Sequence, residues 1–166
     1  MLAALQQANR ASGLLIDLGL EGAEALGELS KDALDGEAKV VASLATPGLT
    51  TVMRLFPGRV VGFAAVVPQP ELPNSPLVRN LLRDSEPVGP EAVTYDGLEA
   101  YVGALVALEA IRRAGPQANS RSVDVEMARL GRLELGGFVM TFDRPGRSAS
   151  EWVDIGLRAR NGLLLR

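Results

Sequence analysis

The sequence predicts an α/β fold built around a mostly parallel sheet. Strand-like and helix-like segments alternate over the first 67 residues, which is the pattern of consecutive βαβ units. One segment, RVVGFAAVV at 59–67, is an uninterrupted apolar run rich in β-branched residues, typical of a strand buried on both faces. With 166 residues, 47% of them hydrophobic, the chain is long enough to enclose a sizeable core.

The first part of the chain supplies the parallel strands. Its expected elements are a helix end at 4–13, a strand at 14–20, a helix at 23–34, a strand at 39–44, a short helix at 49–56 and the strand at 59–67. Short helical connections between parallel strands make right-handed crossovers. The three strands are therefore predicted to be adjacent and mostly parallel.

The amino-acid composition changes after residue 67. PQPELPNSP at 68–76 holds four prolines, so it can neither continue a strand nor sustain a helix, and we interpret it as a crossing segment. The elements expected after it are helices at 77–84, 97–113 and 122–130, strands at 136–142 and 151–157 joined by the polar loop 143–150, and a tight turn at Asn161 and Gly162. The first of these helices has Ser75 as its N-cap and Pro76 at position N1. The second would start with a capping box of Asp96 and Glu99.

Composition excludes several function classes. The net charge is −3 and the 17 basic residues are scattered, so no nucleic-acid partner is expected. The chain has no cysteine and no histidine, and it lacks the nucleophile-elbow, P-loop, zinc-protease and dinucleotide motifs. We expect no enzyme activity, no catalytic residue, no metal site and no cofactor. The first ten residues do not have the pattern of a signal peptide, and no stretch is apolar for the roughly 20 residues of a membrane span.

Several individual residues have both a functional and a structural interpretation. The carboxylate pairs Glu21 with Glu24 and Asp32 with Asp35 could do acid–base work, but a solvated helix face is favoured because buried acidic residues are rare. Tyr101 and Trp152 are expected in the core from their spacing.

The segment Ser43-Leu44-Ala45-Thr46-Pro47-Gly48 follows a predicted parallel strand. Ligands of open α/β sheets bind outside the carboxyl ends of the strands, where helix N-termini present free N–H groups. The hydroxyls of Ser43 and Thr46 could orient a small polar ligand there. The alternative is a plain turn in which Thr46 caps the next helix. Tyr95, just before a helix, is left open between core and ligand contact.

Three stretches resemble the type I periplasmic binding proteins, in particular the Leu/Ile/Val-binding, amino-acid-type receptors of ABC transporters. LELGGFVMTFDRPGRSASEWVDIGLRARNGLLLR resembles their closing segment, with its G-G-F strand, polar turn, V-D strand and terminal N-G turn. VVPQPELPNSPLVRNLL resembles their V-V-P crossing, and TYDGLEAYVGALVALEAIRRAG resembles a helix of the family, with Ala100 where glycine is common. The resemblance covers 56–166, and residues 1–55 agree in pattern only.

The resemblance implies one parallel-sheet lobe with a helical segment of the other lobe, truncated relative to the longer members of the family. Residues 1–67 would form βα units of the second lobe, 68–134 the crossing segment and first-lobe helices, and 135–166 the return to the second lobe. The tail would then tie the lobes together and carry no chemistry. The missing first portion would include an export signal and the first-lobe loops that grip the ligand.

The function implied is solute binding for an ABC-type transporter. The ligand would be an amino acid or similar small polar molecule, contacted by Ser43, Thr46 and Tyr95. The other partners implied are a membrane permease and, as a further option, a second copy in a homodimer, in a periplasmic or extracytoplasmic location. The alternative hypothesis is a non-catalytic structural or regulatory interaction domain that has lost the ligand cleft.

Overall fold

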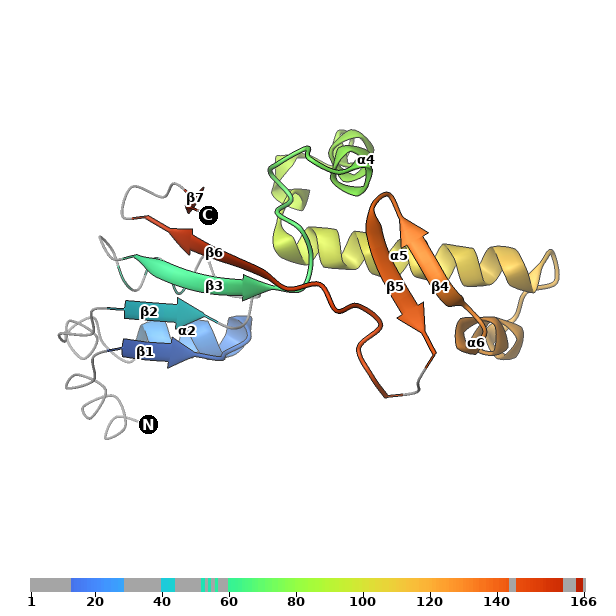
Figure 1. Cartoon of the computed structure of the whole chain (residues 1–166), viewed down its shortest axis with the longest axis horizontal. Helices are drawn as coiled ribbons and strands as arrows, with labels where there is room; N and C mark the ends of the chain where they lie inside the picture. Colours follow the sequence, from blue (N-terminus) through green and yellow to red (C-terminus); the bar gives the residue numbers. More distant parts are fainter. Residues whose placement is uncertain are drawn as a thin grey trace. The chain divides into compact units, whose positions relative to one another are not determined.

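The chain divides into two compact units. The computed structural model describes residues 13–28, 40–43, 52, 54, 56, 60–143, 146–159 and 164–165 (Figure 1). Unit 1 contains the described residues up to Ala65 and from Val153 onward, and unit 2 is Val66–Trp152.

Unit 1 is a five-stranded sheet in the order β1-β2-β3-β6-β7, together with helix α2 (Figure 1). The bounds are β1 Gly13–Ile16, α2 Leu20–Glu28, β2 Val40–Ser43, β3 Val61–Ala65, β6 Asp154–Arg158 and β7 Leu164–Leu165. β1, β2 and β3 are parallel neighbours, while β6 runs antiparallel to β3 and β7 antiparallel to β6. The predicted α/β class, with adjacent parallel strands from the three apolar segments, is confirmed.

The two faces of this sheet differ in burial. Side chains alternate along a strand, and residues paired across strands point to the same face. The buried face carries residues that are at most 4% exposed, namely Ile16, Val41, Ser43, Val61, Phe63 and Ala65. On the opposite face Leu15, Ile155 and Leu157 are exposed, whereas Ala42 and Ala64 are half-buried and Gly62 is buried.

Unit 2 consists of helices and one hairpin. Its elements are α4 Pro76–Ser85, the 3₁₀ turn η1 Pro90–Ala92, α5 Tyr95–Ala114, α6 Ser120–Ala128, β4 Gly131–Leu135 and β5 Phe138–Phe142. The predicted start of α4 is confirmed, because the Ser75 hydroxyl accepts a hydrogen bond from the Val78 amide at 3.3 Å and Pro76 stands at the first helical position. α5 buries Tyr95, Leu98, Val102, Val106 and Ala110, which recur every three or four residues.

The capping box predicted at Asp96 and Glu99 is wrong. α5 starts earlier, with Thr94 as its N-cap, and the Thr94 hydroxyl accepts a hydrogen bond from the Gly97 amide at 3.0 Å. A genuine capping box lies at α6, between Asn119 and Ser122. Thr94 lies two residues before Asp96 and directly before Tyr95, the first buried residue of α5, so the helix starts earlier than the Asp96 pattern indicated.

The pairing of the C-terminal strands also differs from the expectation. The segments 136–142 and 151–157 do contain β5 and β6, but β5 pairs with β4 in a separate two-stranded sheet and β6 pairs with β3. Strand β4 was not predicted. The helix expected at 122–130 ends at Ala128, and the segment GRLEL, from Gly131 to Leu135, forms β4 shortly after it. Gly136 and Gly137, both with positive φ, make the hairpin turn that places β4 beside β5.

The hairpin belongs to unit 2, and the residues from Val153 onward belong to unit 1. The helix expected at 4–13 and the turn at Asn161 lie outside the described residues, as do parts of the helices expected at 23–34 and 49–56. No helix among the described residues is both long and apolar enough to cross a membrane.

Candidate ligand-binding site

Ser43 is the last residue of β2 and lies on the buried face of the unit 1 sheet. Its neighbours in the same row are Ile16 of β1 and Phe63 of β3, and its side chain is 1% exposed. The hydroxyl therefore faces the core of unit 1. Thr46, the second predicted site residue, lies outside the described residues.

The carboxyl ends of β1 and β2 meet at one edge of the parallel sheet, which is where α/β folds place their ligand-contacting loops. Asp17 follows β1 directly at this edge, it is exposed, and α2 begins three residues later. Asp17 is not among the site residues predicted from the sequence. The signal that could have found it is a polar residue immediately after a predicted parallel strand.

Tyr95, the third predicted site residue, is the first residue of α5 and belongs to unit 2. It is 9% exposed, so most of its ring is in the core of that unit. Ser43 and Tyr95 thus belong to different units, and each is placed only within its own.

A concavity of about 590 Å³ lies within unit 2, beside the β4–β5 hairpin. It is lined by two arginines, two carboxylates and an indole: Arg132, Arg147, Asp143, Glu151 and Trp152. The loop that forms its far wall is held to the hairpin by the Thr141 amide, which donates to the Ala149 carbonyl at 2.7 Å. This mixture of charges and one aromatic face suits a small polar molecule better than an apolar one.

Trp152 was expected in the core, and this expectation is wrong. The side chain is 42% exposed and precedes β6, so it is not in a strand. Its ring is tilted against that of Phe138, with centroids 6.1 Å apart, and Phe138 is buried. The indole therefore has one face on the core of unit 2 and another toward solvent.

Tyr101 joins α5 to α4 through its hydroxyl. Its oxygen donates to Asp84 Oδ2 at 2.7 Å, and burial together with this hydrogen bond raises the pKa of Tyr101 to about 12. The hydrogen bonds from Arg83 and from Tyr101 hold the pKa of Asp84 below its ordinary value. The phenol stays neutral at physiological pH. Tyr101 was expected in the core, and the structure shows it only half-buried.

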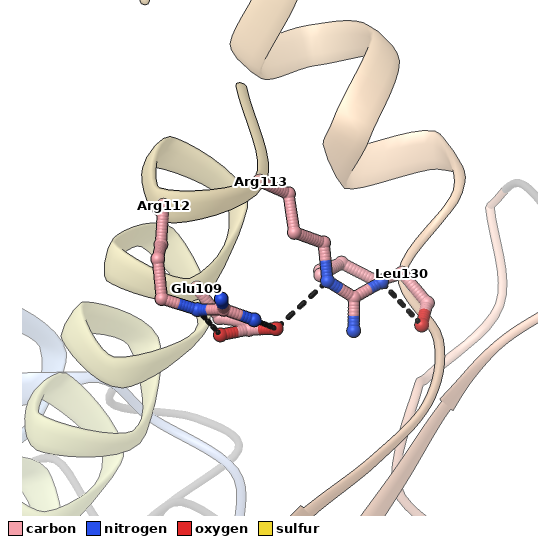
Figure 2. Close-up of polar contacts among 4 residues, drawn as sticks. All are labelled: Glu109, Arg112, Arg113 and Leu130. Atoms are coloured by element: carbon pink, nitrogen blue, oxygen red, sulfur yellow. Dashed lines mark hydrogen bonds and ion pairs between the residues drawn. The ribbon is translucent and has the colours of Figure 1, made fainter. Parts of the chain in front are cut away.

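A charge cluster lies at the C-terminal end of α5 (Figure 2). Glu109 accepts hydrogen bonds from Arg112 at 2.8 Å and from Arg113 at 2.7 Å, and Arg113 also donates to the Leu130 carbonyl at 3.2 Å. The two guanidinium groups lower the pKa of Glu109 to about 2. Since all its charges are paired within the unit, this cluster holds α5 to the segment before β4 and is not a reactive site.

Of the two carboxylate pairs, Glu21 and Glu24 are exposed on α2, which agrees with a solvated helix face. Asp32 and Asp35 lie outside the described residues. Within the described part of the chain, no three acidic side chains come together in a group that could hold a metal ion.

Comparisons with known proteins place this fold. No protein-family model and no curated protein matches the chain. A substrate-binding periplasmic protein from Ralstonia solanacearum matches 98% of the chain at 26% identity and a TM-score of 0.75, and the match covers 48% of that protein.

Two further solved structures match to a similar extent. An extracellular ligand-binding receptor from Verminephrobacter eiseniae ef01-2 matches 99% of the chain at 21% identity and a TM-score of 0.77, covering 48% of that protein. A possible leucine/isoleucine/valine-binding protein from Rhodopirellula baltica SH 1 matches 99% of the chain at 18% identity and a TM-score of 0.70, covering 46% of that protein.

The chain therefore has the fold of the type I periplasmic binding proteins, and the resemblance seen in its sequence is confirmed. It spans about half the length of the solved structures that it matches.

Proposed function

We propose that the chain is a solute-binding component of an ABC-type transporter, and that its ligand is an amino acid or a similar small polar molecule. The observation that carries this proposal is the match of almost the whole chain to three structures described as substrate-binding, ligand-binding or leucine/isoleucine/valine-binding proteins. The absence of histidine and cysteine from the sequence agrees with a non-catalytic role.

The solute would contact the edge of unit 1 formed by the carboxyl ends of β1 and β2. Thr46 would offer its hydroxyl to the solute, and Ser43, buried at the end of β2, is the second residue of the proposed site. Tyr95 remains a ligand contact predicted from the sequence alone. In this proposal the protein acts in a periplasmic or extracytoplasmic location and delivers its solute to a membrane permease.

Affinity for the solute should be weak in this chain alone. A well-formed pocket buries some 70–90% of a ligand's surface, and association costs several kcal/mol of lost translational and rotational freedom. A chain that covers about half of its structural neighbours offers only part of those contacts. We expect dissociation constants on the order of millimolar, equivalent to about −4 kcal/mol.

Isothermal titration calorimetry with a panel of amino acids tests the proposal, using Thr46→Ala and Ser43→Ala together as the site variant. Ser120→Ala, an exposed serine in unit 2, is the matched control. Weak heats lost in the site variant and kept in the control would support the site. Micromolar affinity that survives both substitutions would contradict the site and the expected weakness together.

The second candidate function is a non-catalytic structural or regulatory interaction domain. The uncovered apolar surfaces of both units favour it, since Ile155 is 72% and Leu108 60% exposed. A chain that shows no heat with any amino acid but associates stably with another polypeptide would favour this candidate over the receptor.

A further inference from the structure

The concavity beside the β4–β5 hairpin lies wholly within unit 2, because its lining residues fall between Arg132 and Trp152. One wall is a face of the hairpin. Side chains alternate along a strand and the register pairs Arg132 with Thr141, so these two side chains share that face with Val139. The far wall is formed by residues of the loop between Arg147 and Trp152.

The far wall is held in place by contacts within unit 2. The Thr141 amide donates a hydrogen bond to the Ala149 carbonyl at 2.7 Å, and the Trp152 amide donates to the Ser150 hydroxyl at 3.0 Å. The Trp152 ring also packs against the buried ring of Phe138. Because these contacts order the wall before any ligand arrives, the entropy cost of binding there is reduced.

Three charged side chains of the lining have no ion pair or hydrogen bond to any residue that the structure describes. They are the guanidinium groups of Arg132 and Arg147 and the carboxylate of Glu151. Other arginines of unit 2 do form ion pairs with carboxylates, namely Arg83, Arg112, Arg113 and Arg129. Two cations and one anion at the concavity are therefore available to a ligand.

The lining carries both signs of charge in balance. Its charged groups are two guanidinium groups and two carboxylates, the second carboxylate being Asp143. A ligand with charge of one sign would meet like charges as well as opposite ones, whereas a ligand with both signs can be matched to both.

The chemistry of the individual groups fits such a ligand. Guanidinium groups bind carboxylates through paired N–H donors, and the face of an indole attracts an ammonium group. Trp152 can offer its ring because the side chain is 42% exposed. The volume of about 590 Å³ falls within the roughly 300–1,000 Å³ of small-molecule sites.

We propose that this concavity is a binding site for a small zwitterion, a molecule with one carboxylate and one ammonium group. Arg132 and Arg147 hold the carboxylate, while Glu151 and the indole of Trp152 hold the ammonium group. All these residues belong to unit 2, so the site is separate from the edge of unit 1 that contains Ser43. The inference goes beyond the proposed solute site and does not rest on it.

Trp152 reports directly on this site, because it is the only tryptophan and lies in the lining. The full chain is titrated with glycine, β-alanine and γ-aminobutyrate, in which a growing spacer separates the two charges, and its tryptophan fluorescence is followed. We expect a saturable change with at least one of them, with a dissociation constant on the order of millimolar, because the charged groups are exposed to water. The corresponding acid without the ammonium group and the amine without the carboxylate should each bind at least tenfold more weakly.

Substitutions localise the site. Arg147→Gln and Glu151→Gln each remove one charge and should each weaken binding at least tenfold. Arg121→Gln is the matched control, because Arg121 is an exposed arginine of α6 outside the lining, and it should leave the affinity unchanged. In the variant that combines Ser43→Ala with Thr46→Ala, the fluorescence response should persist, which separates this site from the one proposed in unit 1.

Four outcomes would overturn the inference. The first two are no fluorescence change with any of the three zwitterions, and equal affinity for the analogues that lack one charge. The third is a response that neither Arg147→Gln nor Glu151→Gln weakens. The fourth is a response that disappears in the variant of Ser43 and Thr46, which would assign the binding to unit 1. Loss of the calorimetric signal in that variant, with the fluorescence response kept, would support both sites.

Discussion

Unit 1 and unit 2 are stabilised in different ways. Unit 1 assembles its sheet from strands far apart in the chain, with β3 pairing both β2 and the distant β6. Unit 2 is built from consecutive elements, each helix beginning at a side-chain cap: Ser75, Thr94 and Asn119. Its two strands form a hairpin of immediate neighbours. Non-local pairing carries a loop-closure cost that local contacts avoid.

We therefore expect substitutions in one unit to leave the stability of the other unchanged. Trp152, the only tryptophan, lies in unit 2 and touches its core through Phe138. Its fluorescence therefore reports on unit 2, whereas circular dichroism follows both units.

The largest effect is expected from truncating the core of unit 1. Phe63 is 4% exposed in the central strand β3, and Phe63→Ala should cost about 3–5 kcal/mol of unfolding free energy through lost burial and a cavity. In urea titrations, the circular dichroism transition should move to lower denaturant while the Trp152 fluorescence transition stays in place.

The matched variant in unit 2 is Leu98→Ala, at a fully buried position of α5, with an expected cost of about 2–5 kcal/mol. It should move the fluorescence transition. If Phe63→Ala moved both signals equally, the two units would unfold as one, and the comparison between them would fail.

A smaller effect is expected at the hairpin turn of unit 2. Gly136 has φ +58°, and an added Cβ would lie 2.6 Å from the Leu77 backbone nitrogen. Gly136→Ala should cost about 2–4 kcal/mol, combining backbone strain with steric overlap. Gly146→Ala, also at positive φ but with nothing within 4 Å of the new Cβ, should show only the strain. If urea titrations followed by Trp152 fluorescence gave the two variants the same loss of unfolding free energy, a close approach between the hairpin turn and α4 would be contradicted.

The N-cap of α5 should contribute about 1 kcal/mol. Thr94→Ala removes the acceptor for the Gly97 amide and should lower the stability of unit 2 by about that amount in urea titrations. Asp96→Ala should cost only a few tenths of a kcal/mol, through the helix dipole. A larger loss of stability in Asp96→Ala than in Thr94→Ala would support the capping box expected from the sequence.

The smallest effect is a pH dependence at Glu109. Its pKa is lowered from 4.5 to about 2 in the folded protein, so the folded state binds this proton less readily than the unfolded state. The stabilisation is therefore fully present above pH 4.5 and is lost as the pH falls toward 2.

As the pH falls from 4.5 toward 2, the difference in unfolding free energy of unit 2 between the wild type and Glu109→Gln should disappear. Urea titrations followed by Trp152 fluorescence measure this difference. Glu86→Gln, an exposed carboxylate after α4, is the control. A stability difference between wild type and Glu109→Gln that stays constant with pH would show that the ion pairs with Arg112 and Arg113 do not contribute through this charge.

Sequence patterns predicted local features well. Ser75 with Pro76 specified the start of α4, and the apolar run at 59–67 specified β3, since capping and burial on both faces depend on adjacent residues. The same kind of reasoning misplaced the cap of α5 and missed β4, because GRLEL is short and helix and strand patterns overlap over five residues.

The candidate site was less predictable. The segment after β2 could be predicted as a site, because parallel topology places ligand sites at the carboxyl edge of the sheet. The burial of Ser43, which is 1% exposed, could not be predicted, because it follows from the register of Ser43 with Ile16 and Phe63 on the neighbouring strands. The concavity beside the hairpin could not be foreseen, because Arg132 and Trp152 come from segments brought together only by the folded loop.

The class of fold, the parallel order of the first three strands, the starts of several helices and the family resemblance follow from the sequence alone. They depend on periodicity and on capping residues within a few positions of one another. The sequence does not specify that β5 pairs with β4 while β6 pairs with β3, or that Ile155 and Leu108 are exposed. Strand partners and side-chain exposure depend on contacts between distant segments, because the alternation within one strand specifies which residues share a face but not which strand lies beside it.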